Sequence, residues 1–135
     1  MEQVNLRFKS LEKALLRLSE SLTFFAKEKP SAPFYTQLRD SVIQRFEFCV
    51  DIFWKCLKDH LEAKHGIKVA SPKSAFRESA AQDIISLHEF QILEKMIDSR
   101  NESSHRYDEI MANDIAIQVG DYHKLMKDIL ERIKA

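Results

Sequence analysis

The fold of this chain is decided by residues 34–65, which read FYTQLRDSVIQRFEFCVDIFWKCLKDHLEAKH. Two apolar stripes run along this stretch at the spacing of an α-helix, and Phe48 and Trp54 add apolar surface outside them. A helix that is apolar over most of its circumference is buried on more than one side. We therefore expect residues 34–65 to form a helix that serves both the core and a subunit interface. Lys64 and His65 suit its last turn, and Gly66 can take the left-handed cap that ends it. The first stripe contains Leu38, Val42, Cys49 and Cys56 with Ile52 beside it, and the second contains Ile43, Phe46, Val50, Phe53, Leu57 and Leu61.

Another long helix is predicted over residues 4–27, ahead of a segment with two prolines. Its apolar residues alternate in steps of four and three, which is the pattern of a heptad seam. We expect Leu6, Leu16 and Phe24 to widen that seam into the broader stripe of a bundle helix. Pro30 disfavours helical geometry in the residue before it, so the helix ends there. The seam contains Val4, Phe8, Leu11, Leu15, Leu18, Leu22 and Phe25.

The second half of the chain predicts one short helix and two longer ones. A serine–proline pair reads as the N-cap and first turn of a short helix over residues 72–82. A further helix begins at Ser86, and the last begins near Tyr107 or Asp108. Gly120 weakens the last helix by about 1 kcal/mol relative to alanine, and we expect the close approach of another helix to compensate.

Together these segments predict an all-α fold, an antiparallel up-and-down four-helix bundle with one additional short helix. The 135 residues include only two glycines and three prolines, which leaves few turns for a many-stranded sheet. The length corresponds to a single domain over residues 1–135. No apolar run is long enough to span a membrane and no signal-peptide pattern is present, so we expect a cytoplasmic location.

The charges balance: lysine plus arginine and aspartate plus glutamate number 21 each, so the formal net charge is zero. The chain therefore lacks the general basic field that attracts nucleic acid. Any contact with RNA or a nucleotide has to come from a local patch.

The two cysteines, Cys49 and Cys56, lie on one predicted helix. Their separation is about 10 Å along the helix axis, which exceeds the reach of a disulfide within one chain. We expect both to be buried as small hydrophobic residues, with a bridge across a dimer axis as the alternative.

The densest group of polar side chains lies in residues 100–107, which read RNESSHRY. On an unbroken helix, residues five apart are rotated by ~140° from each other, so Arg100 and His105 would not share a face. The asparagine and serines between them are poor residues for a helix interior and readily make local caps. We expect either a helix break that folds His105 and Tyr107 back toward Arg100, or a site completed by another subunit.

These residue types suit chemistry on a phosphate ester. Arg100 offers a bidentate fork for phosphate oxygens, and His105 can act as a base and then as an acid near neutral pH. Together they predict metal-independent RNA cleavage in which the ribose 2′-hydroxyl is the nucleophile and Arg100 stabilises the phosphorane. The alternative is structural: Arg100 pairs with a nearby acid such as Asp98 or Glu102, and His105 caps a helix end.

No other group of residues forms a recognisable catalytic or metal-binding motif. His60 and His65 are expected on different helix faces, as solvated or capping residues rather than metal ligands. His123 has Asp121 close by without further ligands. The sequence has no phosphate-binding glycine loop, zinc-ligand spacing or nucleophile elbow, so neither a metal nor a cofactor is predicted.

The spacing of Arg100, His105 and Tyr107 resembles the Arg-x4-His-x-Tyr motif of the HEPT-domain superfamily. The segment Ser71-Pro72-Lys73 with its alanine-rich short helix, together with residues 98–109, narrows the resemblance to the nucleotidyltransferase substrate-binding proteins. The likeness covers nearly the whole chain in length and helix order. It implies a helical bundle that forms a homodimer, and a partner, a minimal nucleotidyltransferase, that is commonly encoded by the adjacent gene.

The resemblance implies two alternative roles. In the first, the chain is the toxin of a toxin–antitoxin module, a ribonuclease whose catalytic residues are Arg100 and His105 and which AMP attachment to Tyr107 neutralises. In the second, it is a non-catalytic subunit that binds substrate or nucleotide and completes the partner enzyme. The supporting or binding residues are then Asn101, Ser104 and Arg106.

Overall fold

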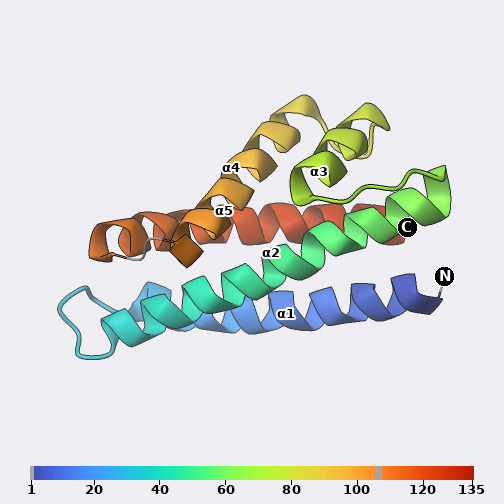
Figure 1. Ribbon diagram of the computed structural model, residues 1–135. Coiled ribbons are helices and arrows are strands. Elements are labelled where there is room, and N and C mark those ends of the chain that lie inside the picture. The colour runs from blue at the N-terminus through green and yellow to red at the C-terminus, as the bar shows by residue number, and fades with distance from the viewer. Residues whose placement is uncertain (1, 106–107) are drawn as a thin grey trace.

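The computed structural model describes residues 2–105 and 108–135, which form five α-helices (Figure 1). The helices are α1 (Glu2–Lys27), α2 (Tyr35–His65), α3 (Pro72–Ala81), α4 (Leu87–His105) and α5 (Glu109–Lys134). The described residues contain no β-strand. The predicted all-α fold with four long helices and one short helix is confirmed.

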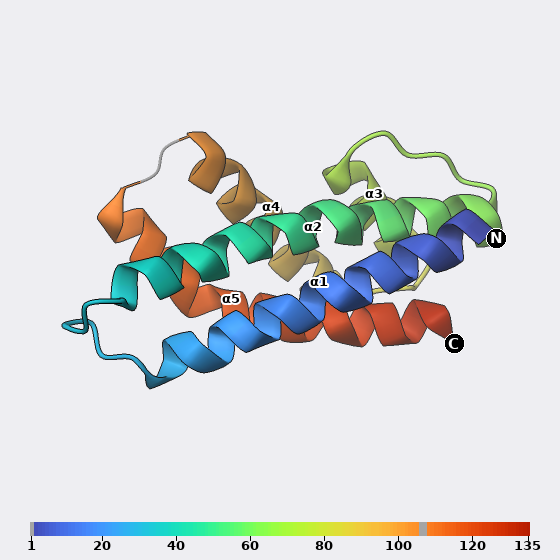
Figure 2. The same ribbon diagram turned by 90° about the horizontal axis from the view of Figure 1, so that it is seen from below.

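The four long helices alternate in direction along the chain, so that α1 and α4 run opposite to α2 and α5 (Figures 1 and 2). α2 is the central element, because it packs against every other helix. α1 packs on α2 and α5, α4 also packs on α2 and α5, and the short α3 packs on α2 and α4. This arrangement brings the start of α2, the end of α4 and the start of α5 to one end of the bundle.

Local capping chemistry fixes the helix boundaries. Gly66 ends α2 with a φ of +67°, a left-handed conformation that glycine adopts without strain, as its position after Lys64 and His65 predicts. Ser71 starts α3 with a capping box, in which its side chain accepts a hydrogen bond from the Ser74 backbone and the Ser74 side chain accepts one in return. The end of α2 and the start of α3 are therefore fixed by residues at these boundaries.

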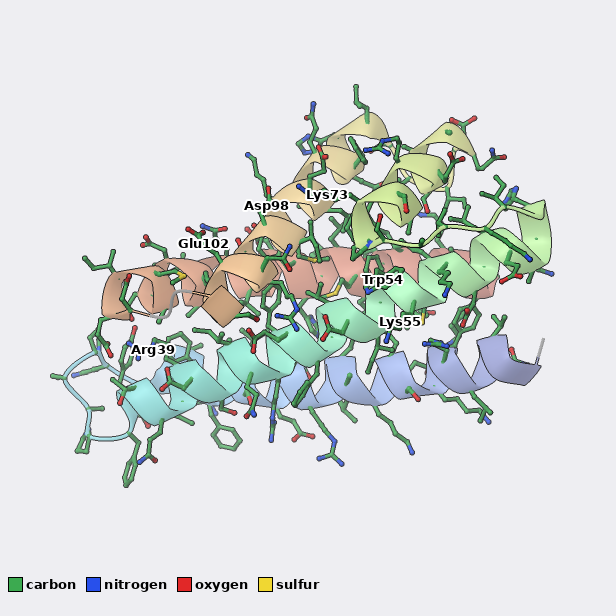
Figure 3. All side chains as sticks on the ribbon, viewed as in Figure 1. Arg39, Trp54, Lys55, Lys73, Asp98 and Glu102 are labelled. Carbon is green, nitrogen blue, oxygen red and sulfur yellow. The ribbon has the colours of Figure 1, made fainter. Side chains whose placement is uncertain are left out.

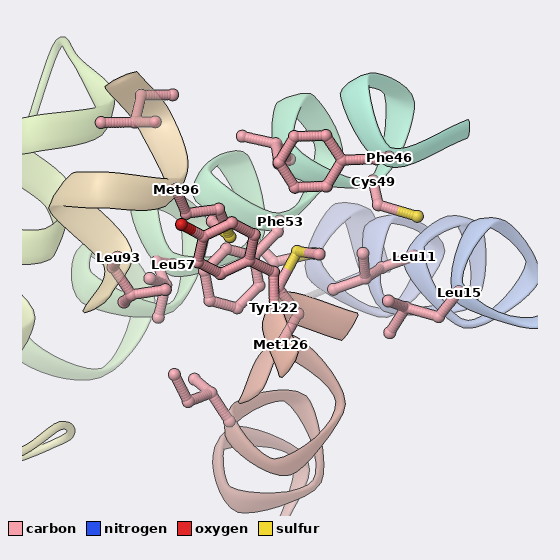
Figure 4. Close-up of a cluster of buried hydrophobic side chains, with 14 of the residues drawn as sticks. Leu11, Leu15, Phe46, Cys49, Phe53, Leu57, Leu93, Met96, Tyr122 and Met126 are labelled. Carbon is pink, nitrogen blue, oxygen red and sulfur yellow. The ribbon is translucent and has the colours of Figure 1, made fainter. Parts of the chain in front are cut away.

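The core is one apolar cluster to which all five helices contribute (Figure 4). Both predicted stripes of α2 supply buried residues, among them Phe46 and Phe53. Phe46 stacks on Tyr122 of α5, with ring centroids 5.7 Å apart.

Cys49 and Cys56 are buried free thiols, as predicted, and burial raises the pKa of each to about 12. Among the described residues, no helix is long and apolar enough to cross a membrane.

Two predictions about packing are wrong. Leu6, Leu16 and Phe24 do not widen the α1 seam: all three side chains are exposed, because they lie ~140° around the helix from buried Leu11. Gly120 is not approached by another helix, since a Cβ added there would meet no atom within 4 Å. It lies on the exposed side of α5, and no packing contact offsets its cost there.

Candidate functional site

The motif arginine, Arg100, lies on the side of α4 that faces α2. Its Nε donates to Asp51 Oδ1 at 2.9 Å and its Nη2 to Asp51 Oδ2 at 3.0 Å, so that the guanidinium and the carboxylate form a two-pronged pair. The Nη1 group donates to the hydroxyl of Ser104, one turn farther along α4. The hydrogen bond to Asp51 raises the pKa of Arg100 above its ordinary value, so the guanidinium is permanently charged.

A second carboxylate, that of Glu47, lies one helical turn before Asp51 on α2. Its Oε2 is 3.8 Å from Nη1 of Arg100 and accepts a hydrogen bond of 2.6 Å from the buried hydroxyl of Ser103. Ser104 approaches the same oxygen at 3.4 Å. The end of α4 is therefore tied to the middle of α2 by one arginine, two hydroxyls and two carboxylates.

A shallow groove of about 540 Å³ lies beside this cluster, between the first half of α2 and the end of α4. Its lining includes the carboxylates of Asp40 and Glu47, the hydroxyl of Ser103 and the uncharged polar side chains of Gln37, Ser41 and Gln44. The amide and hydroxyl groups are donors and acceptors of the kind that pair with the edge of a nucleobase, whereas the two carboxylates make the groove acidic.

The predicted helix break between Arg100 and His105 is wrong, because α4 stays helical through His105. The serines that were expected to break it instead bond within the helix and across to α2: the Ser103 hydroxyl donates to the Arg100 carbonyl at 2.9 Å and to Glu47. On this continuous helix His105 starts ~140° around the axis from Arg100. The backbone positions of the two residues therefore lie on different sides of α4.

The remaining predicted residues divide into two groups. Asn101 and Ser104 are exposed on the last turns of α4, and Ser104 contacts Arg100 directly. The side chain of His105, together with Arg106 and Tyr107, lies outside the described residues.

The alternative pairing predicted for Arg100 is also wrong in its partners. Asp98 pairs with Lys73 of α3 at 3.0 Å, and Glu102 is exposed on α4 (Figure 3). Asp51 and Glu47 of α2 form the ion pairs with Arg100 instead, because Arg100 lies on the face of α4 that packs against α2.

Sequence reasoning missed a buried cation near this site, Arg39 of α2 (Figure 3). Its side chain is only 2% exposed, and its Nη1 donates to Glu109 Oε2 at 2.5 Å and to Asn113 Oδ1 at 3.2 Å. Asp40 accepts from its Nε and Nη2 at 3.1 and 3.0 Å. The hydrogen bond to Glu109 is the largest of the effects that raise the pKa of Arg39. One signal was available: Arg39 lies four residues before Ile43 and so continues a buried stripe of α2.

The other histidines do not form a metal site in the described part of the chain, where no group of three or more histidine, cysteine, aspartate or glutamate residues is placed to hold a metal ion. His60 and His65 lie closer than their spacing predicts, with ring centroids 5.8 Å apart. Burial, together with the positive charge that His65 can carry, lowers the pKa of His60. His123 is hydrogen-bonded through Nε2 to the backbone carbonyl of Leu15 at 3.0 Å.

Comparison with known proteins identifies the family to which this chain belongs. Residues 6–135 match the family model described as nucleotidyltransferase substrate binding protein like. A crystal structure of a Thermus thermophilus protein is 34% identical, covers 93% of this chain and 99% of its own, and superimposes with a TM-score of 0.81. No match was found among curated proteins.

Two more distant structures share the fold. One is a tri-AMPylated Shewanella oneidensis HEPN toxin in complex with an MNT antitoxin, at 18% identity, with 97% of this chain and 96% of that chain covered and a TM-score of 0.74. The other, from Haemophilus influenzae, is described as the substrate binding domain of a nucleotidyltransferase, at 22% identity, with 99% and 98% covered and a TM-score of 0.60. With the match over residues 6–135, this five-helix chain belongs to the nucleotidyltransferase substrate-binding protein family.

Proposed function

We propose that this chain is the partner subunit of a minimal nucleotidyltransferase and works as the toxin of a toxin–antitoxin pair. The observation that carries the proposal is the family match over residues 6–135 in a chain that also has Arg100, His105 and Tyr107 at motif spacing. A toxin of the same fold, from Shewanella oneidensis, is bound to its antitoxin and carries AMP groups.

The proposed activity is metal-independent RNA cleavage. The ribose 2′-hydroxyl attacks the adjacent phosphate, His105 takes its proton and later protonates the leaving oxygen, and Arg100 stabilises the charge on the phosphorane. On the continuous α4 helix the backbone positions of Arg100 and His105 are ~140° apart around the axis. We therefore place the site in a homodimer, where Arg100 of one protomer faces His105 of its partner.

Control of the activity falls to Tyr107, as the acceptor of AMP from the partner nucleotidyltransferase. AMP attachment adds a negative charge two residues from His105, and this charge repels RNA phosphate. Asn101, Ser104 and Arg106 are the supporting residues around the motif, and Ser104 already contacts Arg100.

A second candidate function is a non-catalytic subunit that binds substrate for the nucleotidyltransferase. It is favoured by one observation: Asp51 and Ser104 occupy the donors of Arg100 in the single chain. In this state the arginine holds α4 against α2, and the groove beside it takes a nucleotide for the partner to use.

The two functions separate in an assay of purified protein with RNA in the presence of EDTA. A ribonuclease toxin cleaves RNA, and Arg100→Ala or His105→Ala lowers the rate by at least about 100-fold, with Arg77→Ala as the exposed-arginine control. Mixing the two inactive variants restores about a quarter of the activity if the site is shared, because half of the randomly formed dimers keep one intact site. Wild-type protein without cleavage supports the non-catalytic subunit.

Modification is tested by co-expression with the minimal nucleotidyltransferase of the same organism and by intact-mass measurement. We expect an increment of one or more AMP groups that Tyr107→Phe abolishes and Tyr35→Phe retains. Absence of both a complex and a mass increment would count against the paired-module function.

A further inference from the structure

The outer face of α5 carries the two most exposed large apolar residues of the described chain. Ile110 is 76% exposed and Ile117 is 78% exposed. Asp114 and Asp121 follow them at helical spacing, so that Ile110, Asp114, Ile117 and Asp121 form one stripe in steps of four, three and four. Exposed apolar residues that are aligned rather than scattered mark a surface for another molecule.

This stripe borders a groove between the end of α4 and the start of α5. The groove has a volume of about 630 Å³, and its lining includes Ile110 and the four carboxylates of Glu102, Asp108, Glu109 and Asp114. No lysine, arginine or histidine is among the described residues that line it. Arg39 pairs with Glu109, and Asp108 accepts a hydrogen bond from the backbone N–H of Met111. The docking proposed below therefore involves the other two carboxylates of the lining, Glu102 and Asp114.

We propose that the stripe and groove, which we call the α4–α5 surface, dock a helix of the partner nucleotidyltransferase whose apolar side carries flanking lysine or arginine residues. The two exposed isoleucines lie two helical turns apart on one face of α5, so the apolar side of a partner helix can contact both. The carboxylates of Glu102 and Asp114 favour a basic occupant and disfavour nucleic acid, because its phosphates would meet negative groups. This inference rests on the proposed function, since it names the surface through which that partner binds.

A second copy of this chain fits the α4–α5 surface poorly. In a two-fold symmetric dimer the same patch meets itself, so that the carboxylates of both copies would lie opposite one another. The predicted dimer contact on α2 has a different composition, with exposed Phe48 and the uncharged Gln44 on that helix and exposed Phe34 at its N-cap. The two surfaces can therefore be used at the same time.

The α4–α5 surface lies close in the sequence to the end of the Arg-x4-His-x-Tyr motif. Two residues that line the groove flank the end of the motif in the sequence: Glu102 is three residues before His105, and Asp108 directly follows Tyr107. A partner helix held there brings the nucleotidyltransferase to the end of the bundle that carries its target residue. Proximity of this kind raises the rate of a group transfer without any new chemical group.

The apolar part of the proposal is tested with purified chain and the purified minimal nucleotidyltransferase of the same organism, by calorimetric titration. The double variant Ile110→Asp, Ile117→Asp should weaken binding by about tenfold or more. The matched control is Leu87→Asp, a residue that is 69% exposed at the start of α4, and it should leave the affinity unchanged. Unfolding temperatures of all variants establish that the exposed substitutions leave the fold intact.

The charged part is tested by salt. Affinity of the wild-type complex should fall as the salt concentration rises, and Glu102→Gln with Asp114→Asn should weaken binding at low salt and flatten this dependence. Affinity that is unchanged in the isoleucine double variant overturns the surface assignment and leaves the proposed function intact. A wild-type chain that binds no nucleotidyltransferase overturns both. Loss of homodimer mass in the isoleucine variant, with partner binding retained, would assign the surface to a second copy instead.

Discussion

Two arginines of this bundle are held by carboxylates in opposite settings. Arg39 is 2% exposed and joins α2 to the first turn of α5 through Glu109 and Asn113. Arg100 joins α4 to α2 through Asp51, and its side chain is 23% exposed. Each arginine donates two hydrogen bonds to one carboxylate, Glu109 for Arg39 and Asp51 for Arg100, but Arg39 has more partners and far less access to solvent.

The difference in solvent access separates an arginine with a structural role from one whose hydrogen-bond partner can be exchanged for a ligand. Water cannot replace the partners of Arg39, so each lost hydrogen bond leaves a buried donor unsatisfied. Solvent reaches Arg100, so a phosphate can compete with Asp51 for the same donors at modest cost. Of the two, only Arg100 is therefore suited to bind a ligand, although sequence position alone does not tell them apart.

The largest effect on stability should come from removing the buried arginine. Arg39→Ala should lower the free energy of unfolding by about 3 kcal/mol, because the side chain loses five hydrogen-bond contacts and its buried stem leaves a cavity. Urea denaturation followed by circular dichroism measures this. Arg132→Ala, which removes a solvent-exposed pair with Glu89 at the other end of α5, is the control and should cost less than half as much.

The matching change at the motif should have a small effect on stability. Arg100→Ala should lower the free energy of unfolding by about 1 kcal/mol or less, since the pair with Asp51 is partly exposed and screened by solvent. The same denaturation experiment applies. A loss as large as that of Arg39→Ala would show that Arg100 is a structural residue and remove the distinction drawn between the two.

The course of the chain could be predicted from the sequence because apolar periodicity and capping residues act locally. The stripe through Ile43 and Phe53 predicted the buried faces of α2, and Gly66 predicted where that helix ends. The exposed Leu16 was misjudged because apolar composition was counted without its angle around α1. Exposure of single leucines is common in soluble proteins, so composition alone did not place it.

The site could be predicted only in part, because its partners come from a distant segment. Arg100 was found from the motif, but Asp51, which holds it, is 49 residues away and has no motif of its own. Only the crossing of α4 over α2 brings the two together. Arg39 was missed for a different reason, since a single arginine in a helix is usually exposed, and its place in an apolar stripe was the one indication that it is buried.

Lowering the pH should weaken the two ion pairs that connect α5 to the rest of the bundle. Hydrogen bonds from Arg39 and from Arg132 lower the pKa of Glu109 and of Glu89, respectively. A carboxyl whose pKa is lower in the folded state contributes stability above its unfolded value of about 4.5, and that contribution is lost as the pH falls toward the lowered pKa. We expect Glu109→Gln and Glu89→Gln each to flatten the fall in unfolding free energy below about pH 4.5.

Chemical denaturation at a series of pH values measures this effect. The exposed Glu12→Gln, whose partner Lys134 lies 3.2 Å away, serves as the comparison and should change the slope less. If Glu109→Gln leaves the slope of unfolding free energy against pH unchanged, the burial of Arg39 does not strengthen the Arg39–Glu109 ion pair. That result would contradict the difference drawn between Arg39 and Arg100.

The smallest effect on stability, and the sharpest test of exchange at Arg100, should come from its partner. Asp51→Asn removes a negative charge and leaves an amide of the same shape, so the free energy of unfolding should change by no more than about 0.5 kcal/mol. Affinity for a short single-stranded RNA should rise about threefold to tenfold, because the phosphate no longer competes with a carboxylate. Fluorescence anisotropy measures the affinity, and adding Arg100→Ala to the variant should cancel the gain. If Asp51→Asn instead weakens binding, Asp51 aims the guanidinium at the phosphate rather than competing with it, since a bidentate carboxylate can fix the plane of the arginine fork.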